Sequence, residues 1–280
     1  MLSFWQQFPF HLDPVLFRAG FFALSWYALC ALLGTVAAVI VLKRCTVLPQ
    51  TLGKKNFEDL LLFLFFGTLL GARLGYVFFY NWPLYRADPA SILLPFAMGE
   101  YIGIAGFSFY GGVLGAALAL FFFARSRNQP FLLLTDAAVL AAPCISFFGR
   151  IGNFLNQELY GRTTTAVLGM RFPGESTLRH PSTLYEALGE GLLLFTALWY
   201  LRHRVRFQGE FTALFLIGYG SIRFFLEYFR TPDPQIGFLS FFGWPLTLGQ
   251  VFSLGFLVLG VLLFWWARKR QYAILSGNFR

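Results

Sequence analysis

The sequence predicts an all-α integral membrane protein with about seven transmembrane helices. Hydrophobic residues make up 57% of its 280 residues, 37 residues are phenylalanine, and only 12% are charged. Soluble domains carry about 25% charged residues, so an ordinary soluble fold is excluded. Seven apolar runs have roughly the length of about 20 residues that a helix needs to cross a bilayer. They cover residues 21–42, 59–80, 106–124, 131–153, 184–201, 211–229 and 248–267.

The positions of the basic residues agree with this count and give the chain an orientation. Of the 22 basic residues, 13 occupy alternate loops between the runs. The positive-inside rule places these loops and the C-terminus in the cytoplasm and the N-terminus outside, as an odd number of spans requires. The net charge of +9 therefore indicates topology, and we expect no nucleic-acid partner. The 13 residues are Lys43, Arg44, Lys54, Lys55, Arg125, Arg127, Arg202, Arg204, Arg206, Arg268, Lys269, Arg270 and Arg280.

We expect a single membrane domain over residues 1–280, without internal repeats or linkers. Residues 1–20 lack the basic start and small-residue cleavage site of a signal peptide, and their mixed aromatic and polar composition predicts a segment in the membrane interface. Residues 81–105 and 157–183 are predicted external arms or loops. Arginines in the second of these either bind anionic headgroups or act as interfacial anchors.

A polar stretch, GRIGNFLNQELYGRTT at residues 149–164, follows an apolar run and falls where a membrane helix ends. An arginine near hydrocarbon costs about 3 kcal/mol or more unless it is paired or wetted. On a continuous helix, Arg150, Asn153 and Gln157 share one face, and a guanidinium beside two amides suits an oxyanion such as a lipid phosphate. The alternative is an arginine that extends to the interface and only closes the helix.

A second polar stripe lies in the sixth run, where Tyr219, Arg223, Glu227 and Arg230 follow one another at helical spacing. Arg223 and Glu227 are one turn apart and are expected to pair, which lowers the cost of burying either charge. A static ion pair that only fixes helix packing is the alternative.

Two further runs carry polar or small residues at helical spacing. In HPSTLYEALGE, Glu186 and Glu190 lie one turn apart, and one of the two carboxylates is expected to balance an arginine. In SFYGGVLGA, Gly111 and Gly115 form a GxxxG pattern, which predicts a close helix–helix contact, with Tyr110 just before it at the outer end.

Together these patterns indicate a pocket for a phosphate-bearing lipid headgroup near the outer leaflet. Arginines from two helices, a carboxylate and several amides suit a transferase with phosphate as its leaving group. Nucleotide-binding glycine loops, zinc clusters and Ser-His-Asp spacing are not found, and the three cysteines are scattered, so we expect neither metal nor cofactor. A lipid or anion transporter with the same pocket is the alternative, although the paired repeats typical of transporters are not visible.

Six motifs in order along the chain resemble the prolipoprotein diacylglyceryl transferase family. The resemblance implies a multi-pass enzyme of the bacterial cytoplasmic (inner) membrane, with its active site toward the outer leaflet and without a cofactor. It implies transfer of the diacylglyceryl group of phosphatidylglycerol to the lipobox cysteine in the signal peptide of a preprolipoprotein, which forms a thioether and releases glycerol-1-phosphate. The motifs are LSWYAL (24–29), GARLGYVFFYN (71–81), SFYGGVLG (108–115), GRIGNFLNQELYG (149–161), HPSTLYE (180–186) and GYGSIRFFLEYFRTPD (218–233).

The resemblance also implies roles for individual residues. The implied catalytic residues are Arg150, Arg223 and Tyr110, with Asp136 as a support. Where relatives have S-F-H-G-G, this chain has tyrosine at position 110, and a phenol with a pKa near 10 is a poor base at neutral pH. Either Tyr110 donates a hydrogen bond while another group takes the thiol proton, or the protein is a weak or altered paralogue. The implied substrate-binding residues are Tyr27, Asn153, Asn156, Glu158, Gly161, Glu186, Tyr219, Glu227 and Arg230.

Overall fold

The structure, a computed structural model, describes residues 3–19, 22–44, 52–92, 96–97, 100–101, 106–204, 206–232, 237–241 and 243–275. The chain forms two compact units. The larger unit comprises Met1–Val47 and Asp136–Arg280, and the smaller unit comprises Leu48–Thr135.

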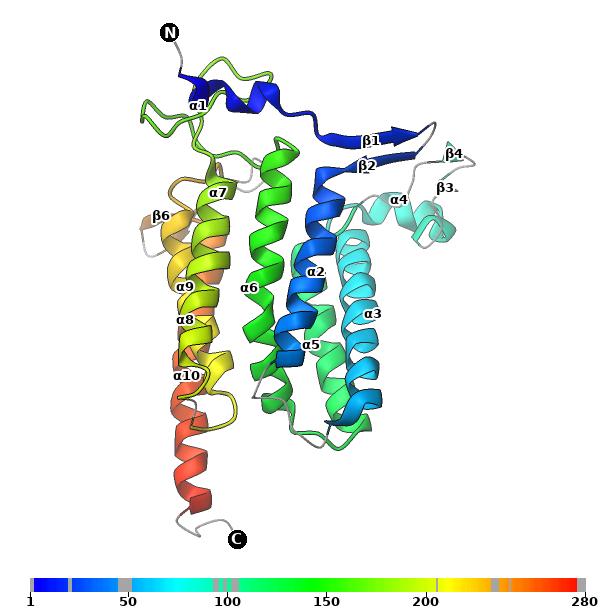
Figure 1. Cartoon of the computed structure of the whole chain (residues 1–280), viewed down its shortest axis with the longest axis vertical. Helices are drawn as coiled ribbons and strands as arrows, with labels where there is room; N and C mark the ends of the chain where they lie inside the picture. The colour runs from blue at the N-terminus through cyan, green and yellow to red at the C-terminus, as the bar shows by residue number, and fades with distance from the viewer. Residues whose placement is uncertain are drawn as a thin grey trace. The chain divides into compact units, whose positions relative to one another are not determined.

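Helices form most of the larger unit. Helix α9 packs against α10 and against the segment α7–η4–α8, and these helices lie side by side in Figure 1. The segment α7–η4–α8 is one continuous helical run whose middle part, η4, is a π-helix. The bounds are α2 (Trp26–Arg44), α6 (Phe131–Leu155), α7 (Ser182–Glu186), η4 (Ala187–Leu193), α8 (Leu194–Leu201), α9 (Glu210–Leu226) and α10 (Leu248–Leu275).

A buried carboxylate joins α6 to the start of α9. Asp136 accepts hydrogen bonds from the backbone N–H groups of Gly209 at 2.7 Å and Thr212 at 2.8 Å, and from the Thr212 hydroxyl at 2.7 Å. These backbone donors lie at the N-terminus of α9, where they have no intrahelical partner. Asp136 therefore supports the fold by capping a helix, as a carboxylate does at a helix N-terminus.

The N-terminal segment and the predicted external loop 157–183 fold together. The segment contains α1 (Phe4–Gln7), η1 (Phe8–His11) and β1 (Val15–Ala19), which pairs antiparallel with β2 (Phe22–Ser25). The Arg171 N–H donates to the Gln6 carbonyl at 2.8 Å, and Phe154, Met170 and Phe172 form a buried apolar cluster against which Phe8 packs. The loop is thus a packed substructure with its own core.

The hairpin of β1 and β2 was not predicted. Helix α2 begins at Trp26 and not at residue 21, because residues 22–25 form a strand.

A second hairpin, β5 (Phe238–Phe241) and β6 (Trp244–Thr247), precedes α10. Thr247 and Gln250 form a reciprocal cap at the start of α10. The Thr247 N–H donates to Gln250 Oε1 at 3.0 Å, and the Gln250 N–H donates to Thr247 Oγ1 at 3.2 Å. This arrangement satisfies two donors that the helix itself leaves open.

In the smaller unit, α3 (Gly53–Phe79) and α5 (Phe109–Ser126) pack through glycines. A Cβ atom on Gly115 would lie 2.8 Å from the Gly71 Cα atom, and one on Gly75 would lie 2.7 Å from the Gly111 Cα atom. Any side chain at these positions would force the backbones apart. The close contact predicted from Gly111 and Gly115 is confirmed.

The predicted arm 81–105 contains α4 (Trp82–Ala87), η3 (Pro89–Ile92), β3 (Phe96–Ala97) and β4 (Glu100–Tyr101), while its residues 93–95, 98–99 and 102–105 lie outside the described part. Arg73 of α3 is buried and fastens this arm. Its guanidinium donates to the carbonyls of Ser91 and Ile92, both at 2.8 Å, and to the carbonyl of Gly106 at 3.2 Å.

Four helices in the described part are long and apolar enough to cross a membrane: Trp26–Arg44, Gly53–Phe79, Phe131–Leu155 and Leu248–Arg270. The chain is therefore a mainly helical membrane protein whose described strands are confined to short hairpins. The other three predicted spans correspond to shorter or interrupted helices, because α9 ends at Leu226, α5 contributes the shorter apolar helix Tyr110–Ser126, and a π-helix divides α7 from α8.

Candidate functional site

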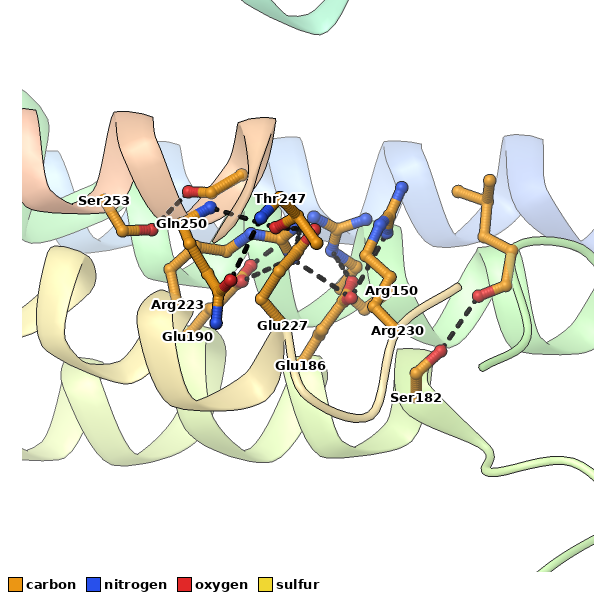
Figure 2. Close-up of polar contacts among 12 residues, drawn as sticks. Arg150, Ser182, Glu186, Glu190, Arg223, Glu227, Arg230, Thr247, Gln250 and Ser253 are labelled. Atoms are coloured by element: carbon orange, nitrogen blue, oxygen red, sulfur yellow. Dashed lines mark hydrogen bonds and ion pairs between the residues drawn. The ribbon is translucent and has the colours of Figure 1, made fainter. Parts of the chain in front are cut away.

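Six charged side chains of the larger unit converge on one another, and we call them the arginine–glutamate cluster (Figure 2). The packing of α9 against α7–η4–α8 brings five of them together, and the close contact of η4 with α6 adds Arg150. The cluster consists of Arg150 on α6, Glu186 at the end of α7, Glu190 in η4, Arg223 on α9, Glu227 at the C-terminal cap of α9, and Arg230 beyond it.

Glu186 lies at the centre of the cluster and contacts three guanidinium groups. Its Oε2 atom is 2.9 Å from Arg150 Nε, and its Oε1 atom is 3.1 Å from Arg223 Nη1 and 3.2 Å from Arg230 Nη1. The Glu186 side chain is fully buried. A buried carboxylate requires such compensation because desolvation of an unpaired charge costs several kcal/mol.

Arg223 connects all three carboxylates. Its Nη1 atom lies 3.1 Å from both Glu186 and Glu190, and its Nη2 atom lies 2.7 Å from Glu227 Oε2. The predicted pairing of Arg223 with Glu227 is confirmed. The planar fork of a guanidinium allows this double attachment, which a single ammonium group does not reproduce.

Glu227 links the cluster to α10. Its Oε1 atom accepts a hydrogen bond from the Thr247 hydroxyl at 3.1 Å, and Thr247 is also the cap of α10. A Cβ atom on Gly249 would lie 2.6 Å from Glu227 Oε1. A larger residue at position 249 would therefore displace the Glu227 carboxylate from its place against the first turn of α10.

The cluster presents its positive groups outward. The arginine side chains are 12% to 18% exposed, whereas those of Glu186 and Glu190 are at most 1% exposed and that of Glu227 is 6% exposed. The carboxylates thus hold the guanidinium groups from behind. Preorganised donors of this kind suit an oxyanion, because they need little rearrangement when it binds or when negative charge develops on it.

Arg230 and Gly161 lie where the loop 157–183 meets the end of α9. The two residues form an antiparallel bridge, and the Gly161 N–H donates to the His180 carbonyl at 2.8 Å. A Cβ atom on Gly161 would collide with the Phe229 carbonyl oxygen and lie 3.0 Å from the His180 carbonyl oxygen. Gly161 therefore allows the close approach that places Arg230 beside Glu186.

The end of α6 departs from the prediction of one polar face. The helix ends at Leu155, and Gln157 has a φ of +59°, so its side chain leaves the face of Arg150 and donates to the Leu12 carbonyl at 2.7 Å. The shared face predicted for Arg150, Asn153 and Gln157 is therefore wrong for Gln157. The predicted stripe on α9 is likewise interrupted, because the helix ends at Leu226 and Arg230 reaches Glu186 from beyond it.

Two amides remain near this helix end. Asn153 donates to Glu158 Oε1 at 2.9 Å, which joins two of the predicted substrate-binding residues. The Oδ1 atom of Asn156 is buried and accepts no hydrogen bond from the described residues.

A smaller charged group lies in the loop 157–183, outside the four helices that are long enough to cross a membrane. Glu175 pairs with Arg179, whose Nη2 atom is 2.9 Å from Glu175 Oε2. A hydrogen bond from Tyr160, followed by the interactions with Arg179, lowers the pKa of Glu175. The same hydrogen bond, together with burial, raises the pKa of the Tyr160 phenol, and burial lowers the pKa of His180.

Comparison with known proteins identifies the family. The family model described as prolipoprotein diacylglyceryl transferase matches residues 14–266. The chain belongs to the prolipoprotein diacylglyceryl transferase family. It is 39% identical over 276 residues to the phosphatidylglycerol–prolipoprotein diacylglyceryl transferase of Chlorobaculum tepidum, covering 96% of this chain and 94% of the relative. The corresponding protein of Pseudoalteromonas atlantica is 40% identical, with 99% and 96% covered, and that of Coxiella burnetii is 38% identical, with 93% and 97% covered.

Two tyrosines of the family motifs lie near the cluster. Tyr27 of α2 lies against α6, where a Cβ atom on Gly152 would be 3.0 Å from its ring. Tyr219 lies one turn before Arg223 on α9, stacked on Phe215 and in edge contact with Phe256.

Tyr110 belongs to the smaller unit. It lies in the first turn of α5 behind the cap Ser108, whose hydroxyl accepts from the Gly111 N–H at 3.3 Å, and its side chain is exposed.

The sequence-based list of site residues omitted Glu190. The structure places it in the cluster, 3.1 Å from Arg223 and 3.5 Å from Arg150. The available signal was its sequence context, since a glutamate inside an apolar run is expected to be functional or paired. Its spacing from Glu186 indicated the same face, but not which of the two carboxylates the arginines contact.

Proposed function

We propose that the protein transfers the diacylglyceryl group of phosphatidylglycerol to the lipobox cysteine thiol of preprolipoproteins. The observation that carries the proposal is the cluster itself, in which Arg150 and Arg223 come from two helices, remain partly exposed, and are held from behind by buried glutamates. Family membership supports the same reaction, since the relatives are named phosphatidylglycerol–prolipoprotein diacylglyceryl transferases.

The chemistry assigns a task to the arginines. The thiol sulfur attacks the glyceryl carbon that bears the phosphate, a sulfur–carbon bond forms, and the carbon–oxygen bond breaks with its electron pair moving to the phosphate. The departing group is glycerol-1-phosphate, and the thiol proton passes to water or to the released phosphate. Arg150 and Arg223 stabilise the charge that grows on the phosphate during this step.

The remaining site residues have supporting tasks in this proposal. Tyr110 donates a hydrogen bond in its neutral form and does not act as the base. No strong base is required, because a thiol with a pKa of about 8.5 needs only modest help to ionise. Glu186 and Glu227 keep Arg150 and Arg223 in place, and Arg230, which also contacts Glu186, adds a third guanidinium for the headgroup. The residues that we assign to binding the headgroup and the peptide are Tyr27, Asn153, Asn156, Glu158, Gly161 and Tyr219.

The proposed setting is the bacterial cytoplasmic membrane, with seven spans, the N-terminus outside and the active site toward the outer leaflet. The alternation of basic loops supports this orientation. Phosphatidylglycerol and preprolipoprotein signal peptides are the proposed substrates, and we propose that residues 1–20 lie in the membrane interface.

The test uses purified protein in vesicles that contain phosphatidylglycerol and a lipobox peptide. We expect a lipidated peptide of lower gel mobility and higher mass, formed only when both substrates are present. A peptide whose cysteine is replaced by serine serves as the control and should remain unmodified. Unmodified cysteine peptide together with movement of labelled phosphatidylglycerol across the bilayer would overturn the proposal in favour of a transporter.

A further inference from the structure

Glu190 is the cluster member for which the proposed function has no task, and its surroundings are unusual. It lies in η4, a π-helix over residues Ala187–Leu193, between Gly189 and Gly191. π-helical turns are rare and occur mostly as single turns within α-helices, frequently at functional sites.

The two glycines let η4 approach the helices that carry the arginines. A Cβ atom on Gly189 would lie 2.8 Å from Ile222 Cγ2 of α9, and one on Gly191 would lie 2.7 Å from Phe147 Cα of α6. A larger residue at position 191 would force the α6 backbone away, and one at position 189 would displace the Ile222 and Leu226 side chains of α9. The Gly-Glu-Gly sequence therefore inserts one carboxylate between α6 and α9.

The contacts of Glu190 follow from this insertion. Its Oε1 atom lies 3.1 Å from Arg223 Nη1, and its Oε2 atom lies 3.5 Å from Arg150 Nη2 and 3.5 Å from the Ser146 hydroxyl. Glu190 thus bridges the two arginines to which we assign the phosphate, and Glu186 contacts both of them as well. Because the Glu190 side chain is 1% exposed, it holds these arginines from behind.

The cluster contains three arginines and three glutamates, so its formal charges cancel when all six groups are ionised. A neutral cluster with outward donors favours an anion by hydrogen bonding, without a large net Coulomb attraction. A second negative charge on the ligand then adds little to the binding free energy. The affinity for a phosphodiester, with one charge, and for a phosphomonoester, with up to two, should be similar.

We propose that Glu190 is a positioning and specificity-determining residue, whose charge keeps the site from retaining a phosphomonoester dianion. This inference rests on the proposed function, in which the lipid substrate is a phosphodiester and the released product a phosphomonoester. Glu190 fixes the two arginines for the substrate and offsets the charge that would otherwise hold the product.

The test measures binding to full-length, detergent-purified protein at pH 8. The probes are glycerophosphoglycerol, a phosphodiester monoanion, and glycerol-1-phosphate, a dianion at this pH because its second pKa is about 6. Removal of one negative charge from a partly buried site should tighten binding of the diester about tenfold and of the monoester about 100-fold, since the Coulomb energy doubles with ligand charge. The selectivity ratio of Glu190→Gln should therefore shift about tenfold toward the monoester.

Two controls separate charge from fold. Glu190→Asp keeps the charge, and its selectivity ratio should stay within about threefold of the wild type. Glu210→Gln makes the same charge change in the first turn of α9, outside the cluster, and should leave the ratio unchanged. A folded Glu190→Gln protein with the wild-type ratio, or a Glu190→Asp protein with the ratio of Glu190→Gln, would overturn the proposal.

The wild-type protein supplies a test that needs no variant. It should bind the monoester at most about threefold more tightly than the diester, and a preference of about 100-fold for the monoester would contradict the charge-balance argument. These binding measurements require no turnover. A failure of the proposed transfer reaction would show as an unmodified lipobox peptide, whereas a failure of the role of Glu190 would show only in the selectivity ratio.

Discussion

Replacement of Arg223 by lysine tests the chemical task of the cluster. Arg223 divides its fork between Glu227 at 2.7 Å on one nitrogen and Glu186 and Glu190, both at 3.1 Å, on the other. A lysine keeps the charge, so it avoids the cost of about 3–5 kcal/mol for leaving buried carboxylates without a partner. A single ammonium group cannot contact both sides and also bind a phosphate oxygen in a fixed direction.

The expected loss is that of one charge-assisted hydrogen bond in the transition state, about 1.5–3 kcal/mol. This corresponds to a decrease of about 10- to 150-fold in the rate of transfer. Lipid binding should fall much less, because the interaction strengthens as negative charge develops on the departing phosphate. Arg150→Lys should behave in the same way, since Arg150 also divides its guanidinium between two carboxylates. Its Nε atom lies 2.9 Å from Glu186 and its Nη2 atom lies 3.5 Å from Glu190.

The assay measures the initial rate of peptide lipidation at saturating peptide, and phosphatidylglycerol binding separately in nanodiscs. Arg171→Lys is the matched control, because Arg171 lies in the external loop and donates to the Glu175 carbonyl, outside the cluster. It should retain nearly the full rate. Near-normal turnover in both Arg150→Lys and Arg223→Lys would refute the assignment of the leaving phosphate to these arginines.

Three further predictions address topology, Tyr110 and the external loop. A reporter that is active only in the periplasm should be bright when fused after Arg171 and dark after Arg206, and the reverse pattern would contradict the proposed orientation. Tyr110→Phe should lower the transfer rate about 10- to 150-fold through loss of one hydrogen bond to an anion, whereas Tyr110→His should be at least as active as the wild type; a fully active Phe variant would show that the hydroxyl has no task. Folding lowers the pKa of Glu175. Its ionised carboxylate therefore stabilises the loop fully at pH values above the usual glutamate pKa of about 4.3, and this stabilisation is lost as the pH falls through the lowered pKa. Proteolysis of the loop should therefore increase on acidification in the wild type but not in Glu175→Gln, and equal acid sensitivity of the two proteins would rule out this role.

The sequence predicted most of the charged cluster because burial of charge in an apolar chain is costly whatever the fold. Arg150, Arg223, Glu186, Glu227 and Arg230 were all selected on that basis or through the family motifs, and the structure brings them together. The membrane class followed from composition for the same reason.

The parts that sequence reasoning missed depend on where helices end and how they bend. Extrapolation of helical spacing placed Gln157 on the face of Arg150, but α6 ends at Leu155 and the chain turns through a left-handed conformation at Gln157. Periodicity also carries no sign of a π-turn, so it did not place Glu190 between two arginines. The apolar core beneath the loop 157–183 depends on contacts between distant segments, such as Phe8 with Phe154, which local patterns do not reveal.

The central claim is that the protein breaks the bond between the diacylglyceryl group and the phosphate while it forms the thioether. The most direct measurement follows phosphatidylglycerol labelled in its glycerol headgroup during lipidation of the peptide. We expect one molecule of labelled glycerol-1-phosphate to be released for each peptide that gains a diacylglyceryl group. Label that remains attached to the peptide, or label released without peptide modification, would contradict the account.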